Sequence, residues 1–114
     1  MISMILPDTL HHVFDLNSGI VLVALLKESD CEYLSQISVL ESIAKQYQNN
    51  VNVFIAEENQ LDFFFNTLST KEYPLSQGTP QFIVFYQGIE STRFIGNAEE
   101  IDLINMISTI HSPY

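Results

Sequence analysis

The sequence is poor in cysteine and in positive charge. Its 114 residues include one cysteine, so no disulfide can form within the chain and a zinc site built from several cysteines is excluded. Four Lys and Arg residues stand against 14 Asp and Glu residues, which gives a net charge of −10. Nucleic-acid phosphates are bound through Lys and Arg, and an anionic membrane surface repels an acidic protein. We therefore expect no nucleic acid and no membrane among the partners.

Two further absences bear on location and organisation. No apolar run approaches the roughly 20 residues that a membrane-spanning helix needs, and residues 1–6 lack the basic region of a secretory signal. No repeat, low-complexity stretch or Pro/Gly/Ser-rich linker divides the chain, and its length is typical of one domain. These features predict a single domain over residues 1–114 in the cytoplasm.

Apolar patterning is the strongest signal that the chain carries. The run at residues 20–26 is unbroken and largely β-branched, which is typical of a strand in the middle of a sheet. Gln87 and Gly88 predict the turn of an antiparallel hairpin. The expected strands are 2–6, 20–26, 51–56, 81–86 and 89–95, and the expected helices are 10–16, 29–48, 59–68 and 97–110. This β-α-β-α-β-α-β-β-α order predicts an α/β fold with a mixed sheet and helices on both faces.

Two helix starts carry capping patterns. Ser29 and Glu32 have the spacing of a capping box, and Asn97 followed by Glu100 has the same form. These patterns predict that one helix begins at Ser29 and that the last helix begins just after Asn97. The residues expected on the buried faces are Leu34, Ile37, Leu40, Ile43, Ala44 and Tyr47 in the first of these helices, and Ile101, Leu103, Ile104, Ile107 and Ile110 in the second.

Several segments, in this order and spacing, resemble the thioredoxin family over nearly the whole chain. The resemblance rests on the strand at residues 21–23, the helix segment at 39–47, the Gly-Thr-Pro sequence at 78–80 before the strand at 82–86, and Gly96 ahead of the last helix. It implies a thioredoxin-like three-layer sandwich. It also implies that the peptide bond inside the Thr-Pro step is cis and lies next to the redox site of the family.

The redox chemistry of that family needs a Cys-x-x-Cys pair at the start of the long helix, and this chain has only Cys31 there. An ungapped match places Asp30 at the nucleophile position and Tyr33 at the resolving position. A match shifted by one residue places Cys31 and Leu34 at these positions instead. Both matches exclude a dithiol cycle. The buried acid of active members is also missing, because the ungapped match puts Ala24 there.

The reactivity of Cys31 has two interpretations. A thiol near a helix N-terminus is favoured as the thiolate by the helix dipole. Glu28, Asp30 and Glu32 oppose this effect, since negative charge beside a thiol disfavours its ionisation. The sequence therefore leaves open a monothiol that forms mixed disulfides and an unreactive, part-buried thiol.

The leading hypothesis for function is a protein-binding, peptide-binding or adaptor module that uses the region around the cis-proline. Exposed backbone groups there would let an extended peptide add in strand fashion. The alternative is a monothiol thiol-disulfide oxidoreductase in which Cys31, as the catalytic residue, attacks a disulfide and a second thiol of low molecular weight resolves the intermediate. The residues expected to bind the partner are Ser29, Asp30, Tyr33, Leu34, Thr79, Pro80 and Gly96.

No metal or cofactor is expected. His11, His12 and His111 lack the spacing and the acidic or thiol neighbours of a metal site, so they are interpreted as surface residues. The Gly-Thr-Pro sequence at 78–80 lacks the lysine of a phosphate-binding loop. The acidic surplus is interpreted as a solubilising surface, with recognition of a basic partner as the alternative.

Overall fold

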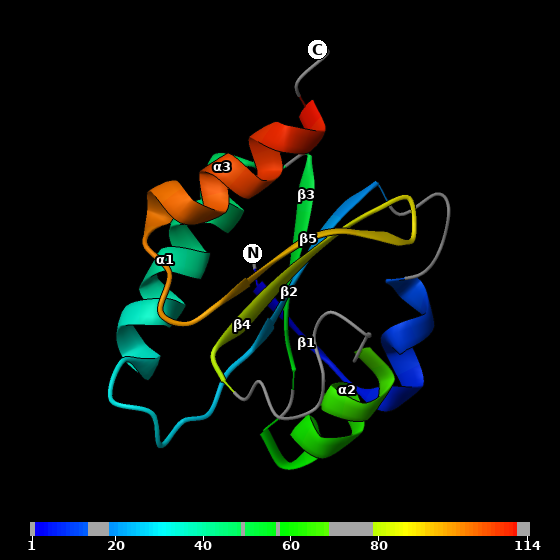
Figure 1. Ribbon diagram of the computed structural model, residues 1–114, viewed down its shortest axis with the longest axis vertical. Coiled ribbons are helices and arrows are strands. Elements are labelled where there is room, and N and C mark those ends of the chain that lie inside the picture. The colour runs from blue at the N-terminus through cyan, green and yellow to red at the C-terminus, as the bar shows by residue number, and fades with distance from the viewer. Residues whose placement is uncertain (1, 14–18, 49, 57, 69–78, 112–114) are drawn as a thin grey trace.

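A computed structural model of the protein describes residues 2–13, 19–48, 50–56, 58–68 and 79–111 (Figure 1). A mixed sheet of five strands in the order β1-β3-β2-β4-β5 forms its centre. The strands are β1 (Ile2–Ile5), β2 (Ile20–Leu25), β3 (Val51–Ala56), β4 (Gln81–Tyr86) and β5 (Ile89–Ile95). The first three run parallel to one another, whereas β4 pairs antiparallel with both β2 and β5.

Helices cover both faces of this sheet and make three layers (Figure 1). The helices α1 (Tyr33–Gln46) and α3 (Glu100–His111) pack on one face. The 3₁₀ helix η1 (Pro7–His12) and α2 (Leu61–Leu68), which follows the short 3₁₀ helix η2 (Glu58–Gln60), pack on the other. In the described part of the chain, no helix has the length and apolarity of a membrane span.

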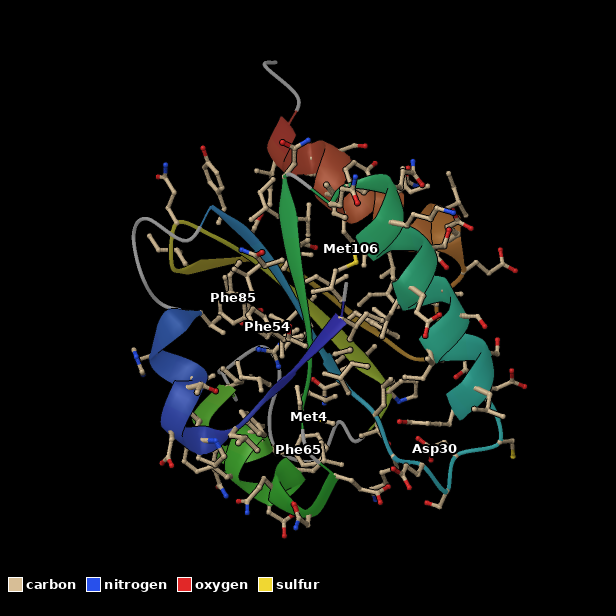
Figure 2. All side chains as sticks on the ribbon, turned by 180° about the vertical axis from the view of Figure 1, so that it is seen from behind. Met4, Asp30, Phe54, Phe65, Phe85 and Met106 are labelled. Atoms are coloured by element: carbon tan, nitrogen blue, oxygen red, sulfur yellow. The ribbon has the colours of Figure 1, made fainter. Side chains whose placement is uncertain are left out.

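The central strand β2 explains why the core has two halves. All six of its residues are buried, and neighbouring side chains point to opposite faces. Leu22 packs into the half under α1 and α3, whereas Val23 packs into the half under α2. Figure 2 shows Met106 on the first side and Phe65 on the second. The apolar run at residues 20–26 was therefore correctly assigned to the middle of the sheet.

Most predicted elements agree with the structure. The expected strands at 51–56, 81–86 and 89–95 have the observed bounds. The helix expected at 10–16 is a 3₁₀ helix that begins earlier, at Pro7, and its expected end lies outside the described residues. The loop expected at residues 69–78 also lies outside them.

The capping pattern at Ser29 gave a wrong helix start. The helix α1 begins at Tyr33, and its N-cap, Glu32, makes no side-chain capping hydrogen bond. Two turns precede it, because the Asp30 N–H donates to the Lys27 carbonyl and the Tyr33 N–H donates to the Asp30 carbonyl, each at 3.0 Å. The segment that holds Asp30 and Cys31 is therefore a loop, and its side chains are free to face a neighbouring segment.

The capping pattern at Asn97 was also wrong, because α3 begins only at Glu100. The buried side chain of Gln36 donates to the Ala98 carbonyl at 2.9 Å and accepts the Ala98 N–H at 2.8 Å. Both backbone groups of Ala98 are thus occupied outside the helix. The carboxylate of Asp102, the third residue of the helix, accepts the Glu99 N–H at 2.8 Å, which is the reciprocal contact of a capping box, so Glu99 and not Asn97 stands at the N-cap.

Two apolar residues do not lie on the buried faces predicted for them. Leu34 is 78% exposed and Ile101 is 54% exposed, each in the first turn of its helix. In the first turn of α1 the buried position belongs to Gln36, whose amide is satisfied by Ala98. Hydrophobic periodicity favours Leu34 for the buried position, because it does not take into account that a polar side chain can be buried when it has a hydrogen-bond partner.

Candidate functional site

An open groove of about 240 Å³ lies where the loop between β2 and α1 meets the turn before β4 and the segment before α3. Figure 2 shows Asp30 in the loop that leads to α1. Three chain segments that are far apart in sequence therefore meet at one place. The residues that line the groove are Asp30, Cys31, Glu32, Thr79, Pro80 and Asn97.

A side-chain hydrogen bond holds two of these segments together. The Thr79 hydroxyl donates to the Asp30 carboxylate over 3.0 Å between Oγ1 and Oδ2. The peptide bond between Thr79 and Pro80 is cis. Asp30, and not Cys31, thus makes the side-chain contact with the residue before the proline.

Some backbone groups around Pro80 form hydrogen bonds within the described residues, and others do not. The Pro80 carbonyl accepts the Gly96 N–H at 2.9 Å, and Gly96 has a φ of 110°, a conformation that favours glycine. Within the described residues, neither the N–H nor the carbonyl of Thr79 has a hydrogen-bond partner. Thr79 lines the groove, so its main chain has one donor and one acceptor left for a partner beyond the described residues.

Cys31 is exposed and lies in the groove. The expectation of a part-buried thiol is therefore wrong, because the turns before α1 hold this loop away from the core. Asp30 and Glu32 line the same groove, and none of the described residues that line it is Lys or Arg. The thiol is therefore accessible to solvent, and the carboxylates of Asp30 and Glu32 line the groove in which it lies.

The other predicted site residues lie around the groove and not in it. Ser29 lines an adjoining cavity of about 460 Å³ together with Glu58. Tyr33 is half-buried, and burial, followed by the negative charges of Glu28 and Glu58, raises its pKa above the ordinary value of 10.0. Leu34 projects from the first turn of α1 into solvent.

Two residues that line the groove were not among the residues expected to bind the partner, although they belong to the predicted region. Glu32 and Asn97 were assigned capping roles, whereas both face the groove. The sequence signal for both was that each directly follows a predicted site residue, since Glu32 follows Cys31 and Asn97 follows Gly96. For Glu32 this adjacency was used only to argue that its charge opposes ionisation of Cys31, and for Asn97 the capping pattern was used instead.

The structure gives no support to a metal centre in the part that it describes. No group of three or more His, Cys, Asp or Glu side chains among the described residues could hold a metal ion. The His11 ring nitrogen instead lies 3.1 Å from the Asp8 carbonyl, within its own 3₁₀ helix.

Comparison with known proteins identifies the fold. No family model and no curated protein matches the sequence. Among solved structures, a mutant thioredoxin from Halobacterium salinarum NRC-1 matches with a TM-score of 0.75 at 17% sequence identity. The match covers 95% of this chain and 88% of that one. The chain therefore has a thioredoxin-like fold, and its single cysteine cannot form the Cys-x-x-Cys pair.

Proposed function

We propose that the protein binds an extended, basic segment of another protein in the groove beside Pro80. The observation that carries this proposal is that the N–H and carbonyl of Thr79, which lines the groove, have no hydrogen-bond partner among the described residues. An extended peptide can pair with such backbone groups as an added strand, which supplies affinity without requiring a particular sequence.

The charge of the groove supports a basic ligand. Asp30 and Glu32 are the charged residues among the described lining of the groove, and Glu28 is exposed on the same loop. Complementary charge raises the association rate and discriminates against acidic partners. Lys or Arg side chains that flank the added strand would meet these carboxylates.

Two fluorescent peptides that share their apolar residues and differ only in charge, one rich in Arg and one rich in Glu, test this proposal. Anisotropy titrations should show the basic peptide binding at least about tenfold more tightly, a difference of about 1.4 kcal/mol, with the gap shrinking in salt. Asn97→Arg should weaken binding of the basic peptide about tenfold, since it places a positive charge in the groove.

Asn105→Arg is the matched control. Asn105 is exposed on α3 outside the groove, so this variant has the same net charge as Asn97→Arg and should bind like the wild type. Equal loss in the two variants would assign the effect to overall charge and remove the groove from the proposal. Failure of the wild type to prefer the basic peptide would overturn the proposal itself.

The exposure of Cys31 supports a second candidate, monothiol exchange. In that reaction the Cys31 thiolate attacks one sulfur of a disulfide, forms a mixed disulfide and releases the other half as a thiolate. A thiol in solution then attacks the mixed disulfide, which restores Cys31 and yields a new small disulfide. Each round therefore consumes one disulfide and one thiol and yields one new disulfide and one new thiol.

The rate at which Cys31 reacts, relative to an ordinary thiol, distinguishes the two candidates, and the charge of the disulfide tests the electrostatics of the groove. Asp30 and Glu32 should make Cys31 react about tenfold faster with the cationic disulfide cystamine than with anionic glutathione disulfide, and salt should reduce this ratio. Adduct formation is followed by mass spectrometry, with Cys31→Ser as the blank and mercaptoethanol as the neutral reference thiol. A Cys31 that outpaces mercaptoethanol by about a hundredfold with both disulfides would favour the enzyme.

A further inference from the structure

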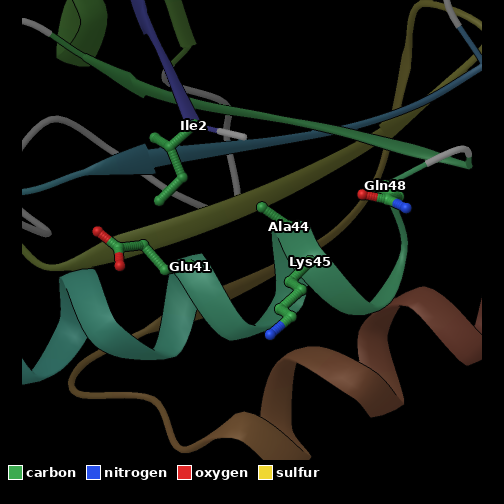
Figure 3. A pocket seen from close by; sticks show the side chains of 5 residues that line it. All are labelled: Ile2, Glu41, Ala44, Lys45 and Gln48. Atoms are coloured by element: carbon green, nitrogen blue, oxygen red, sulfur yellow. The ribbon is translucent and has the colours of Figure 1, made fainter.

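A second groove, of about 390 Å³, lies between the outer strand β1 and helix α1. It is lined by Ile2 on the strand and by Glu41, Ala44, Lys45 and Gln48 along α1. Figure 3 shows Ile2 above the helix on the side of Ala44, with the Glu41 and Lys45 side chains directed to different sides of this apolar centre. The groove thus combines an apolar floor with one negative and one positive charge.

The strand beside this groove has an open edge. Among the described strands, β1 is one of the two edge strands of the sheet and pairs with β3 alone. Its Met4 side chain is 59% exposed and lies on the same face as Ile2, because side chains two apart in a strand share a face. Natural edge strands are commonly protected by very short length, charged residues, prolines or bulges. The strand Ile2–Ile5 is short, with four residues, but it contains no charged residue or proline, so its outer backbone groups can still pair with another chain. This edge is therefore suited to pairing with another strand.

The two charges of the groove have no partner within the described chain. Glu41 and Lys45 have the spacing of a favourable helical ion pair, yet the ion pair between Arg93 and Glu90 is the only one among the described residues. Both side chains are exposed. They are thus available to charges on another molecule.

We propose that this surface, formed by β1 and the Glu41–Lys45 turn of α1, joins two copies of the chain around a two-fold axis. In a two-fold interface, a contact from residue i to residue j is repeated from j to i. Glu41 of each copy then meets Lys45 of the other, and the two β1 strands pair antiparallel at their open edges. The patch is complementary to itself, which is the reason to choose a second copy over an unrelated partner.

The spacing along the two elements fits this arrangement. Four helical residues separate Glu41 from Lys45, about 6 Å at the rise of an α-helix. Two strand residues separate Ile2 from Met4, about 6.6 Å at the rise of a strand. An axis that passes near Ser3 places Ile2 opposite Met4 of the second copy. Because Ile2 lines the groove together with Glu41 and Lys45, the same axis brings the two helical turns close to each other.

Sedimentation velocity on charge variants tests the proposal. The wild type should dimerise, and Glu41→Lys and Lys45→Glu should each weaken the dimer at least about tenfold, since every cross-interface pair becomes like-charged. An equimolar mixture of the two variants should recover a heterodimer, because one variant then has two positive charges at this turn and the other has two negative charges. The double variant Glu41→Lys/Lys45→Glu should recover the homodimer.

The control is Glu99→Lys, which changes the net charge as Glu41→Lys does but lies before α3, outside this groove. It should leave the dimer intact. A wild type that stays monomeric up to about 1 mM overturns the proposal. A dimer that resists both single substitutions, or a variant mixture that stays monomeric, also overturns it by placing any association elsewhere.

Discussion

Replacing Arg93 with methionine is expected to lower the free energy of unfolding by about 3 kcal/mol. The Arg93 side chain is 2% exposed and forms an ion pair with Glu90 at 2.6 Å. Loss of one member of a buried ion pair costs about 3–5 kcal/mol, because the other charge loses its partner. Glu90 is 24% exposed, so water replaces part of the lost interaction and the lower end of this range applies.

Arg93 also joins three elements, which adds to the expected loss. From β5, its guanidinium donates to the Leu68 carbonyl at the end of α2 at 2.6 Å and to the Gln81 side-chain oxygen on β4 at 3.2 Å. Methionine retains an unbranched chain that can fill much of the same space. The measured change therefore reports mainly the polar contacts.

Urea unfolding followed by circular dichroism measures this difference. Arg93→Lys keeps the charge but loses the planar fork, so it should fall between the wild type and Arg93→Met. Lys27→Met removes a cation from an exposed position and should change the free energy of unfolding by less than about 0.5 kcal/mol. An Arg93→Met variant as stable as this control would contradict a stabilising role for the network.

The strands could be predicted from the sequence because the position of a strand in the sheet determines which of its few residues are apolar. Burial on both faces requires an unbroken apolar segment, and β2 and β4 carry one each. The hairpin turn was equally local, since Gln87 and Gly88 both adopt positive φ. These features depend on neighbours in sequence, so one sequence is enough to find them.

Helix starts could not be predicted in the same way, because here contacts between distant segments decide them. The capping pattern at Ser29 is present in the sequence, but Asp30 bonds to Thr79 across the groove and turns precede the helix. Likewise, Ala98 bonds to Gln36 and not to a helical neighbour. A local pattern cannot report a partner that lies many residues away.

The candidate site was predictable as a region but not in its detail. The resemblance placed Asp30, Cys31, Thr79 and Pro80 in one region, and all four line the groove. Two alignments, one residue apart, assigned the central position to Asp30 or to Cys31. Hydrophobic periodicity does not detect a shift of one residue in a loop. The hydrogen bond between Asp30 and Thr79 is what distinguishes the surroundings of Asp30 from those of Cys31.

Gln36→Leu is expected to lower the free energy of unfolding by about 2–4 kcal/mol. Ala98 is 3% exposed, and both its N–H and its carbonyl bond to the Gln36 amide. Each buried group left without a partner costs about 1–3 kcal/mol, and burial of the leucine side chain offsets part of this loss. Gln46→Leu makes the same change at an exposed position of α1 and should shift the free energy by less than about 0.5 kcal/mol.

Gln36→Glu separates the loss of hydrogen bonds from a change in packing. A carboxylate can accept the Ala98 N–H but cannot donate to the Ala98 carbonyl, whereas a protonated carboxyl can do both. Burial and the facing carbonyl should therefore raise the pKa of this side chain in the folded state above its unfolded value. The folded state then holds the proton more tightly, so the variant should approach wild-type stability at acid pH and lose stability as the pH rises through the folded pKa.

Urea unfolding of Gln36→Glu and wild type over a pH series measures this difference, and Gln46→Glu corrects for the added charge. A constant difference at every pH would show that shape and not hydrogen bonding makes Gln36 important. Since Asn97 in the groove directly precedes Ala98, loss of the Gln36 contact should also weaken binding of the basic peptide. That weakening should follow the same pH dependence, because one side chain holds both the start of α3 and the adjoining wall of the groove.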